Sequence, residues 1–436
     1  MLMGSMEMEN MSAETVGEEK VDQEKQMGLE ENNSSNQSIK KKEIRKQKKR
    51  KFRFIPRFGC MRLEDGVPAA EQPDAAGGFD VKAGCNGRNH LPTHLVVMVN
   101  GIIGSAQNWR YAAKQFVKAY PNDVLVHCSE SNSSMLTFDG VDVMGKRLAD
   151  EVVSVVNRHP NLQKISFVGH SLGGLIARYA IAELHQRDLM TKSGEENGEY
   201  GKDESHKSSL EEKPMGNIAG LEPVNFITCA TPHLGSRGHK QVPVFCGFYT
   251  MEKVASRASW ILGRTGRHLF LSDCDEGKPP LLLRMSSDSE DLKFISALQL
   301  FKRRVAYSNA QFDHLVGWSS ASLRRRIELP KRRSLLKNAK YPHIVNEEKS
   351  NTGNPQQEVS SKAKVARRRT AEMEETMLRG LTRLSWERVD VSFKGSMQRL
   401  LAHNTIQACL YLCPKTNTMH TYRFLIDQTV TNTMST

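Results

Sequence analysis

The sequence has no long apolar run, and only 38% of its 436 residues are hydrophobic. A membrane-spanning helix needs roughly 18 or more consecutive apolar residues, and no stretch approaches that length. The first residues also lack the apolar core of a secretory signal. We therefore expect no transmembrane segment, and we expect any membrane contact to be peripheral.

Motifs for metals and nucleotide cofactors are also missing. The eight cysteines include no C-x-x-C pair, no Cys/His cluster has zinc spacing, and neither a P-loop nor a dinucleotide-binding glycine pattern occurs. We predict no metal and no cofactor. We interpret the cysteines as buried, reduced thiols of an intracellular protein. It would be cytoplasmic or peripheral on an internal membrane, with the nucleus as the alternative.

The net charge of +13 is concentrated in one segment. Residues 40–53 contain ten Lys or Arg and one Glu, which leaves +9 in this segment alone. Aromatic and aliphatic residues interleave with the basic ones in residues 40–58, a composition that suits an anionic membrane surface. The same run also fits a nuclear address, a nucleic-acid contact or a solvated tail. We predict no specific nucleic-acid partner.

Strands and helices alternate from about residue 94 onward. Short apolar runs with strand character are separated by segments with helical spacing; the runs are residues 94–100, 123–127, 164–168 and 224–229. Such alternation predicts an α/β fold, with a mostly parallel central sheet and helices on both faces.

Polar segments surround and interrupt this domain. Residues 1–90 are rich in polar and charged residues, which predicts a disordered N-terminal region containing the basic tail. The folded domain is predicted over residues 91–408, with insertions near residues 190–222 and 345–375. Residues 409–436 form an atypical C-terminal tail.

Residues 169–173 (GHSLG) match the pattern G-x-S-x-G. Chance alone produces this pattern about 0.1–0.2 times in a chain of this length, so its context decides. It follows the strand-like KISFV and precedes a helical run, the setting that holds a nucleophilic serine on a strained turn. The start of the helix offers N–H groups to an oxyanion. Ser171 is therefore the predicted nucleophile; a turn with a capping serine is the alternative.

Several motifs together resemble the DUF676 family of lipase-like serine esterases, in particular its plant branch. They are VNGIIGSAQNW (99–109), FVGHSLGGLIARYA (167–180), ATPHLGS (230–236), GRTGRHLFL (263–271) and WERVDVSF (386–393). The resemblance covers residues 94–405 outside the two insertions. It implies an α/β-hydrolase fold and the hydrolysis of carboxylic esters, in particular lipid acyl esters.

This fold places an acid and then a histidine after the serine in chain order. Asp313 follows a strand-like run at residues 301–310, and YSNAQFDHLVGW resembles the strand-then-Asp motif of the family. We therefore predict Asp313 as the acid, with Asp273 and Asp288 as rivals.

The base should be a histidine, because its pKa allows it to accept and return the serine proton near neutral pH. His403 follows the strand-like WERVDVSF and matches the A-H-N signature of the family. We predict it as the base, with His170, His233 and His314 as alternatives.

Residues 100–104 (NGIIG) follow the first strong strand, where this fold supplies an oxyanion donor. We predict that the backbone N–H groups of Ile102 and Leu172 form the donor pair. An ordinary glycine turn is the alternative.

Residues 242–262 are rich in aromatic and aliphatic side chains, which predicts an apolar cap over the serine. A packed helix pair is the alternative. The predicted substrate-contacting residues are Gly101, His170, His233, Phe245 and Phe248.

The sequence thus predicts a serine esterase or lipase that works by a Ser-His-Asp triad through an acyl-enzyme. After Gln407, however, the chain lacks the strand and helix expected of the family, which would weaken the support of His403. A catalytically impaired scaffold and a membrane- or nucleus-directed protein dominated by its basic tail are the alternatives. A thioester or protein-acyl substrate also stays open.

Overall fold

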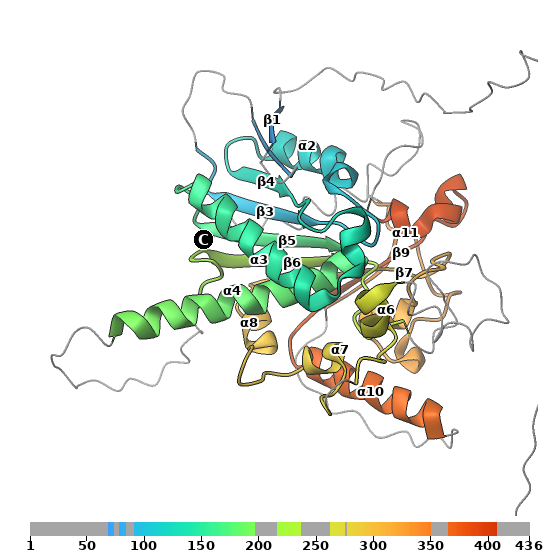
Figure 1. Ribbon diagram of the computed structural model, residues 1–436. Helices are drawn as coiled ribbons and strands as arrows, with labels where there is room; N and C mark the ends of the chain where they lie inside the picture. Colours follow the sequence, from blue (N-terminus) through green and yellow to red (C-terminus); the bar gives the residue numbers. More distant parts are fainter. Residues whose placement is uncertain are drawn as a thin grey trace, which may run out of the picture. The chain divides into compact units, whose positions relative to one another are not determined.

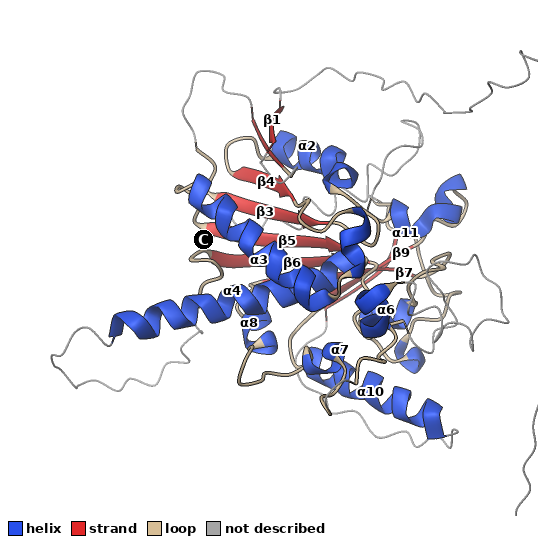
Figure 2. Ribbon diagram, in the orientation of Figure 1, coloured by secondary structure: helices blue, strands red, loops and turns tan. Residues whose placement is uncertain are grey.

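A nine-stranded sheet forms the centre of the protein in the computed structural model (Figures 1 and 2). The structure describes residues 69–73, 78–83, 91–196, 216–236, 262–274, 277–339, 341–349 and 365–407. The strand order is β1-β2-β4-β3-β5-β6-β7-β9-β8. The strands are β1 (Ala69–Pro73), β2 (Phe79–Ala83), β3 (His94–Val99), β4 (Val124–Cys128), β5 (Lys164–His170), β6 (Glu222–Cys229), β7 (Arg303–Asn309), β8 (Ile344–Lys349) and β9 (Glu387–Val391).

The sheet is mostly parallel. All neighbouring pairs from β4 through β3, β5, β6 and β7 to β9 are parallel. Strand β2 is antiparallel to both of its neighbours, and β8 is antiparallel to β9. Parallel neighbours end at the same edge of a sheet, so loops that follow β3, β5, β7 and β9 meet there. This is the topology of an α/β-hydrolase fold.

Helices connect the strands. The α-helices are α2 (Arg110–Ala119), α3 (Val141–Arg158), α4 (Leu172–Glu196), α6 (Gly263–Leu269), α7 (Leu281–Arg284), α8 (Phe294–Gln299), α9 (Trp318–Ser322), α10 (Val365–Leu381) and α11 (Ala402–Thr405). Single 3₁₀ turns are η1 (Ala106–Trp109), η2 (Ser134–Phe138), η3 (Arg326–Glu328) and η4 (Met397–Leu401). Among the described residues, no helix is both long and apolar enough to cross a bilayer.

The core lies in two layers, one on each face of the sheet. Successive side chains of a strand point to opposite faces, so Leu95 and Val97 of β3 pack with α3 and α4, whereas Val96 and Met98 pack with α2. Helices therefore cover both faces, as predicted. Each fully buried aliphatic side chain contributes about 1.5–3 kcal/mol of transfer free energy.

Order begins earlier in the chain than predicted. Strands β1 and β2 lie inside the region 1–90, so the prediction of disorder is wrong for these ten residues. Phe79 and Val81 are buried, and Asp80 bonds to His127 of β4 at 2.7 Å. Partners distant in the sequence thus stabilise a hairpin that its own composition does not reveal. Residues 1–68, 74–77 and 84–90, including the basic tail, lie outside the described residues.

Parts of both predicted insertions belong to the folded domain. Residues 190–196 complete α4, and β8 and α10 lie largely within 345–375. The polar composition of β8 reflects solvent exposure, because its second half is exposed at the edge of the sheet. Residues 197–215 and 350–364 and the tail 408–436 are outside the described part of the chain.

Candidate active site

Ser171 lies on a sharp turn between β5 and α4. Its φ of 52° is in the left-handed region, which a residue with a side chain rarely adopts. The surrounding backbone is packed too closely for larger residues: a Cβ at Gly169 would lie 2.6 Å from Gly174 Cα, and one at Gly173 would lie 2.3 Å from the Val99 carbonyl oxygen. The glycines of the motif therefore allow the turn, and close packing maintains the strained serine.

Three side chains from distant parts of the sequence meet at this turn. The Ser171 Oγ lies 2.9 Å from Nε2 of His403, and His403 Nδ1 lies 3.0 Å from Asp313 Oδ2. They follow β5, β9 and β7 respectively, at the shared carboxyl edge of the sheet. Because a carboxylate only accepts hydrogen bonds, Nδ1 of His403 carries a proton, and Nε2 of a neutral ring accepts the serine hydroxyl. The arrangement can remove a proton from Ser171.

The carboxylate of Asp313 is held by several donors. Asn309 Nδ2 donates to Oδ2 at 2.9 Å, and the backbone N–H groups of Leu315 and Val316 donate to Oδ1 at 2.9 Å each. Burial by itself raises the pKa of Asp313, but its interaction with His403 and these hydrogen bonds hold the pKa below its usual value. Asp313 is therefore ionised at neutral pH and fixes the orientation of the imidazole.

The structure places His170 beside His403. Its Nε2–H donates to the His403 carbonyl oxygen at 2.8 Å, and the ring centroids are 4.8 Å apart. Burial and the neighbouring His403 lower the pKa of His170 to about 3, so its ring is neutral. Because this buried ring is engaged by the His403 backbone, its predicted contact with substrate is not supported; it positions the His403 loop.

His233 is also placed away from any substrate surface. It is fully buried, its Nε2 bonds to Thr228 Oγ1 at 3.0 Å, and its ring packs edge-on against Trp386. The prediction that His233 contacts substrate is therefore wrong. The TPHLG loop folds back into the core, where burial keeps the pKa of His233 well below its usual value.

The rival acids serve as helix caps. Asp273 Oδ2 accepts the N–H of Leu281 at the start of α7, and Asp288 Oδ1 accepts the N–H of Ile295 in the first turn of α8. The rival base His314 has an exposed side chain. The hydrogen bonds described for the Ser171 hydroxyl and the His403 ring involve none of the three.

The loop after β3 contacts the serine. A Cβ at Gly101 would lie only 2.9 Å from the Cβ of Ser171, so the backbone there approaches closely. Asn100 Nδ2 anchors the loop by donating to the Asn132 carbonyl oxygen at 2.9 Å. Leu172 is the first residue of α4 and has no acceptor within the helix. Both features suit the predicted oxyanion donors, Ile102 and Leu172, whose role stays a prediction.

Phe245 and Phe248 lie outside the described residues, as does all of the predicted cap except Leu262. Within the described part of the chain, no group of three or more His, Cys, Asp or Glu could hold a metal ion.

Two supporting residues are missing from the sequence prediction. Asn309 joins Asp313 to the backbone of the His403 loop, because its Nδ2 also donates to the Ala402 carbonyl oxygen at 3.2 Å. Asn132 holds the loop after β3 through its carbonyl oxygen. Asn309 precedes the predicted acid by four residues in YSNAQFD, which is the one available signal. Its second partner is 93 residues away and leaves no local pattern.

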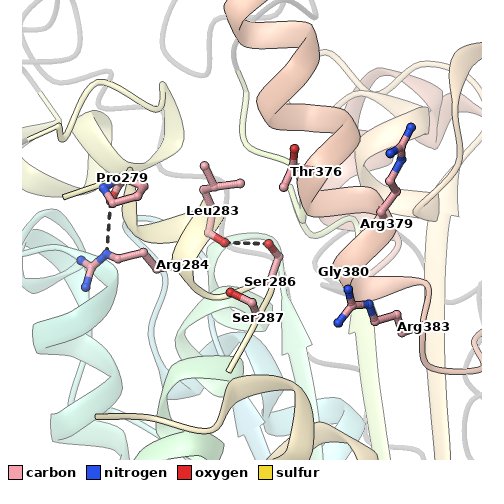
Figure 3. Close-up of a pocket in the computed structure, with 9 residues that line it drawn as sticks. All are labelled: Pro279, Leu283, Arg284, Ser286, Ser287, Thr376, Arg379, Gly380 and Arg383. Carbon is pink, nitrogen blue, oxygen red and sulfur yellow. Dashed lines mark hydrogen bonds between the residues drawn. The ribbon is translucent and has the colours of Figure 1, made fainter. Parts of the chain in front are cut away.

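A cavity of about 330 Å³ lies between α7 and α10, apart from the serine (Figure 3). Its lining residues are Pro279, Leu283, Arg284, Ser286, Ser287, Thr376, Arg379, Gly380 and Arg383. Figure 3 shows that Arg284 turns toward Pro279, whose carbonyl oxygen accepts its Nε–H at 3.2 Å. Ser171, Asp313 and His403 do not line this cavity, so it is not part of the serine site.

A family model described as "Putative serine esterase (DUF676)" matches residues 89–323, more than half of the chain. Ser171 and Asp313 lie within the match, and His403 lies beyond it. "Putative lipase ROG1" of Saccharomyces cerevisiae is 30% identical over 236 residues, 53% of this chain and 28% of that protein. "Putative lipase C4A8.10" of Schizosaccharomyces pombe is 25% identical over 240 residues, 53% of this chain and 26% of that protein. The chain spans less than a third of the length of these relatives.

Solved structures of esterases superpose only weakly on this chain. Carboxyl esterase 2 of Tuber melanosporum is 10% identical, covers 85% of this chain and 88% of its own, and has a TM-score of 0.37. Lipase BlEst2 of Bacillus licheniformis in mature form is 14% identical, covers 57% and 76%, and has a TM-score of 0.29. Overlaps at this level carry no argument about function. The family match, however, covers the sharp turn at Ser171 and the strands around it. This chain therefore belongs to the DUF676 family of serine esterases.

Proposed function

We propose that the protein is a carboxylic-ester hydrolase in which Ser171, His403 and Asp313 form the catalytic triad. The observation that supports this most directly is the 2.9 Å contact between Ser171 Oγ and His403 Nε2 on a left-handed turn. A buried serine with an ordinary structural role needs neither the strained backbone nor an imidazole oriented by a carboxylate.

The geometry supports a two-step acyl transfer. As Ser171 Oγ attacks the ester carbonyl carbon, His403 Nε2 takes its proton, and the ionised Asp313 stabilises the imidazolium. The N–H groups of Ile102 and Leu172 would bind the oxyanion, and losing one such donor typically lowers kcat about 10²–10³-fold. Collapse breaks the ester bond, and His403 protonates the leaving alcohol. Water, deprotonated by His403, then attacks the acyl-enzyme; the bond to Ser171 Oγ breaks, His403 returns the proton to that oxygen, and the carboxylic acid is released.

We extend this proposal to lipid acyl esters. The similar yeast proteins carry the name lipase, and residues 242–262 have the composition of an apolar cap. The basic segment 40–58 would bring the enzyme to an anionic membrane surface. These supports come from composition and relatedness, so the acyl chain and head group are to be found by experiment.

Activity-based labelling tests the triad. A fluorophosphonate probe should label the parent chain, and Ser171→Ala should abolish the labelling. His403→Ala should reduce the labelling rate by several orders of magnitude while the variant stays folded, because the general base is lost. Ser134→Ala is the matched control, since this serine lies on a 3₁₀ turn outside the triad. A folded parent that is not labelled would favour a scaffold role instead.

A panel of p-nitrophenyl esters and acylglycerols of increasing chain length then tests the substrate. Preference for long acyl chains supports the lipid proposal. Preference for acetyl or butyryl esters contradicts it without affecting the triad.

A further inference from the structure

Several exposed large apolar side chains lie on segments that lead to the residues in contact with Ser171, which are Gly101 and His403. Eleven such residues are exposed in the described part of the chain, and six of them lie on three segments: the loop after β3, η2 and η4. The six, which we call the apolar rim, are Ile103, Met135, Leu136, Met397, Leu400 and Leu401, with exposed fractions between 44% and 85%. Single exposed apolar residues are ordinary, but a group at one site marks an interaction surface.

The first half of the apolar rim is joined to the loop that contacts the serine. Ile103 N–H donates to Thr137 Oγ1 at 3.0 Å, and Ser134 N–H donates to the Gly104 carbonyl oxygen at 3.0 Å. These bonds connect the loop after β3 to η2, which carries Met135 and Leu136. The side chain of Met135 is 71% exposed. Because hydrogen bonds hold the turn on both sides of it, this exposed side chain lies on an ordered segment.

The second half of the apolar rim leads directly to His403. Turn η4 carries Met397, Leu400 and Leu401 and continues without a break into α11. Figure 1 shows α11 and the turn before it at the edge toward which the arrows of β3 and β5 point. The ring of His170 lies between the loop after β3 and the segment that carries His403, since one ring nitrogen is close to Gly101 and the other bonds to the His403 carbonyl oxygen.

Two exposed cations lie beside the second half of the apolar rim. Lys394 and Arg399 are exposed beside η4, and neither has an ion-pair partner among the described residues. Of the nearby acids, Asp139 pairs with Arg147 at 2.6 Å, whereas Glu130 accepts the N–H of Ala106 and keeps its negative charge beside the first half of the rim. Apolar side chains flanked by free cations match the acyl region and head groups of an anionic bilayer, in which each basic residue near the surface contributes attraction.

We infer that the apolar rim inserts into the surface of an anionic lipid bilayer, with Lys394 and Arg399 at the head groups. In this position Ser171 faces substrate held in the bilayer. The inference depends on the proposed function only for the identity of the substrate, because membrane contact does not require catalysis. It also differs from binding by the basic segment 40–53, which is electrostatic and does not involve the apolar rim.

Vesicle flotation of the full chain separates these contributions. All variants carry Ser171→Ala so that no lipid is hydrolysed, and vesicles contain phosphatidylcholine with phosphatidylserine. At about 1 M salt the Debye length falls to about 3 Å, which screens the basic segment and leaves apolar insertion. Met135→Asp with Leu400→Asp should weaken partition about tenfold or more, because two apolar contacts become charged. The matched control replaces exposed leucines distant from the serine, Leu91→Asp with Leu189→Asp, and should partition like the parent.

A fluorescence experiment tests directly whether the apolar rim enters the bilayer. Leu400→Trp should be quenched by vesicles with brominated acyl chains, and Leu91→Trp should not, relative to the four native tryptophans common to both. Three results would overturn the inference: equal quenching at both positions, equal partition of both double variants, or a parent that does not float at high salt. A parent that sediments as a dimer without lipid and becomes a monomer in the Met135/Leu400 variant would also overturn it, because a second copy would then cover the rim. Absence of fluorophosphonate labelling would affect only the proposed function.

Discussion

At the scale of single residues, Asn309 shows how a side chain outside the triad can control it. Its amide donates both to Asp313 and to the backbone of the His403 loop. The single amide group of Asn309 therefore holds both the carboxylate of the acid and the loop that carries the base. Its effect on the reaction should therefore be orientation, and it should touch no substrate.

We predict that Asn309→Ala lowers kcat about tenfold, the loss expected from one buried hydrogen bond of about 1.4 kcal/mol, and leaves KM nearly unchanged. Steady-state kinetics on a soluble ester measures both. Because one donor to Asp313 is lost, its pKa should rise and its carboxylate should stabilise the imidazolium of His403 more strongly, so the acid limb of the pH–rate profile should move to higher pH. Asn309→Asp places a second carboxylate beside the first and should lower kcat further than Asn309→Ala does. Unchanged kcat and pH profile in Asn309→Ala would contradict a positioning role.

Single residues also show what the sequence could and could not reveal. The turn at Ser171 is predictable because the residues that determine it are neighbours in the sequence: the glycines at 169 and 173 and the strand and helix on either side of Ser171. The position of His233 is not, because its partners Thr228 and Trp386 define its burial only after β6 and β9 come together. Local motifs fix local backbone, whereas burial depends on contacts between distant segments.

At the scale of elements, the β1–β2 hairpin depends on a buried charged cluster. His127 of β4 lies between two carboxylates, with Nδ1 2.7 Å from Asp80 and Nε2 3.1 Å from Glu151. Arg158 and His159 also approach Asp80, at 3.3 and 3.1 Å. Both ring nitrogens face acceptors, so His127 is an imidazolium in the folded protein. The cluster joins the hairpin to β4 and α3.

The cluster makes stability depend on pH. Burial by itself lowers the pKa of His127, but the bonds to Asp80 and Glu151 raise it to about 9. A raised folded-state pKa gives stability that is complete below the unfolded value of about 6.5 and is lost as pH rises through 9. The pKa of Asp80 is lowered, so its contribution is lost in acid. The loss between pH 6 and 9.5 should be on the order of 3 kcal/mol.

Urea unfolding at these two pH values measures this dependence. His127→Phe should be less stable than the parent at pH 6 and should lose the decrease between pH 6 and 9.5, since it has no proton to release. His314→Gln is the matched control because that histidine is exposed. A His127→Phe variant with the same pH dependence as the parent would contradict the assignment.

The hairpin and β8 also explain which elements sequence patterns miss. Central strands such as β3 are apolar along their whole length and are recognised directly. Strand β1 (AAEQP) and strand β8 (IVNEEK) lie at the edges of the sheet, and Gln72 and Pro73 of β1 and the last three residues of β8 are exposed. Their hydrogen-bonding partners, rather than their composition, determine that they are strands.

At the scale of the whole molecule, the serine site depends on how the last strands are held against the rest of the sheet. Asp390 of β9 is fully buried and accepts hydrogen bonds from four side chains on three other elements and their connecting loops: Ser308, Trp318, Arg324 and Asn346. Strand β9 precedes the loop that carries His403. The same carboxylate therefore supports both the edge of the sheet and the position of the imidazole.

We predict that Asp390→Asn destabilises the protein by about 3 kcal/mol, as expected when one partner of a buried ion pair is removed. The cost should be at the low end of that range because Arg324 Nε–H still donates to Glu348 at 2.9 Å. Glu387→Gln is the matched control: it is the same isosteric change in the same strand, but its pair with Arg303 is partly exposed and should contribute about 1 kcal/mol or less. Urea unfolding gives both values. Equal destabilisation by the two substitutions would mean that the buried network does not hold β9, and the support of His403 would then have to come from α11 and His170 alone.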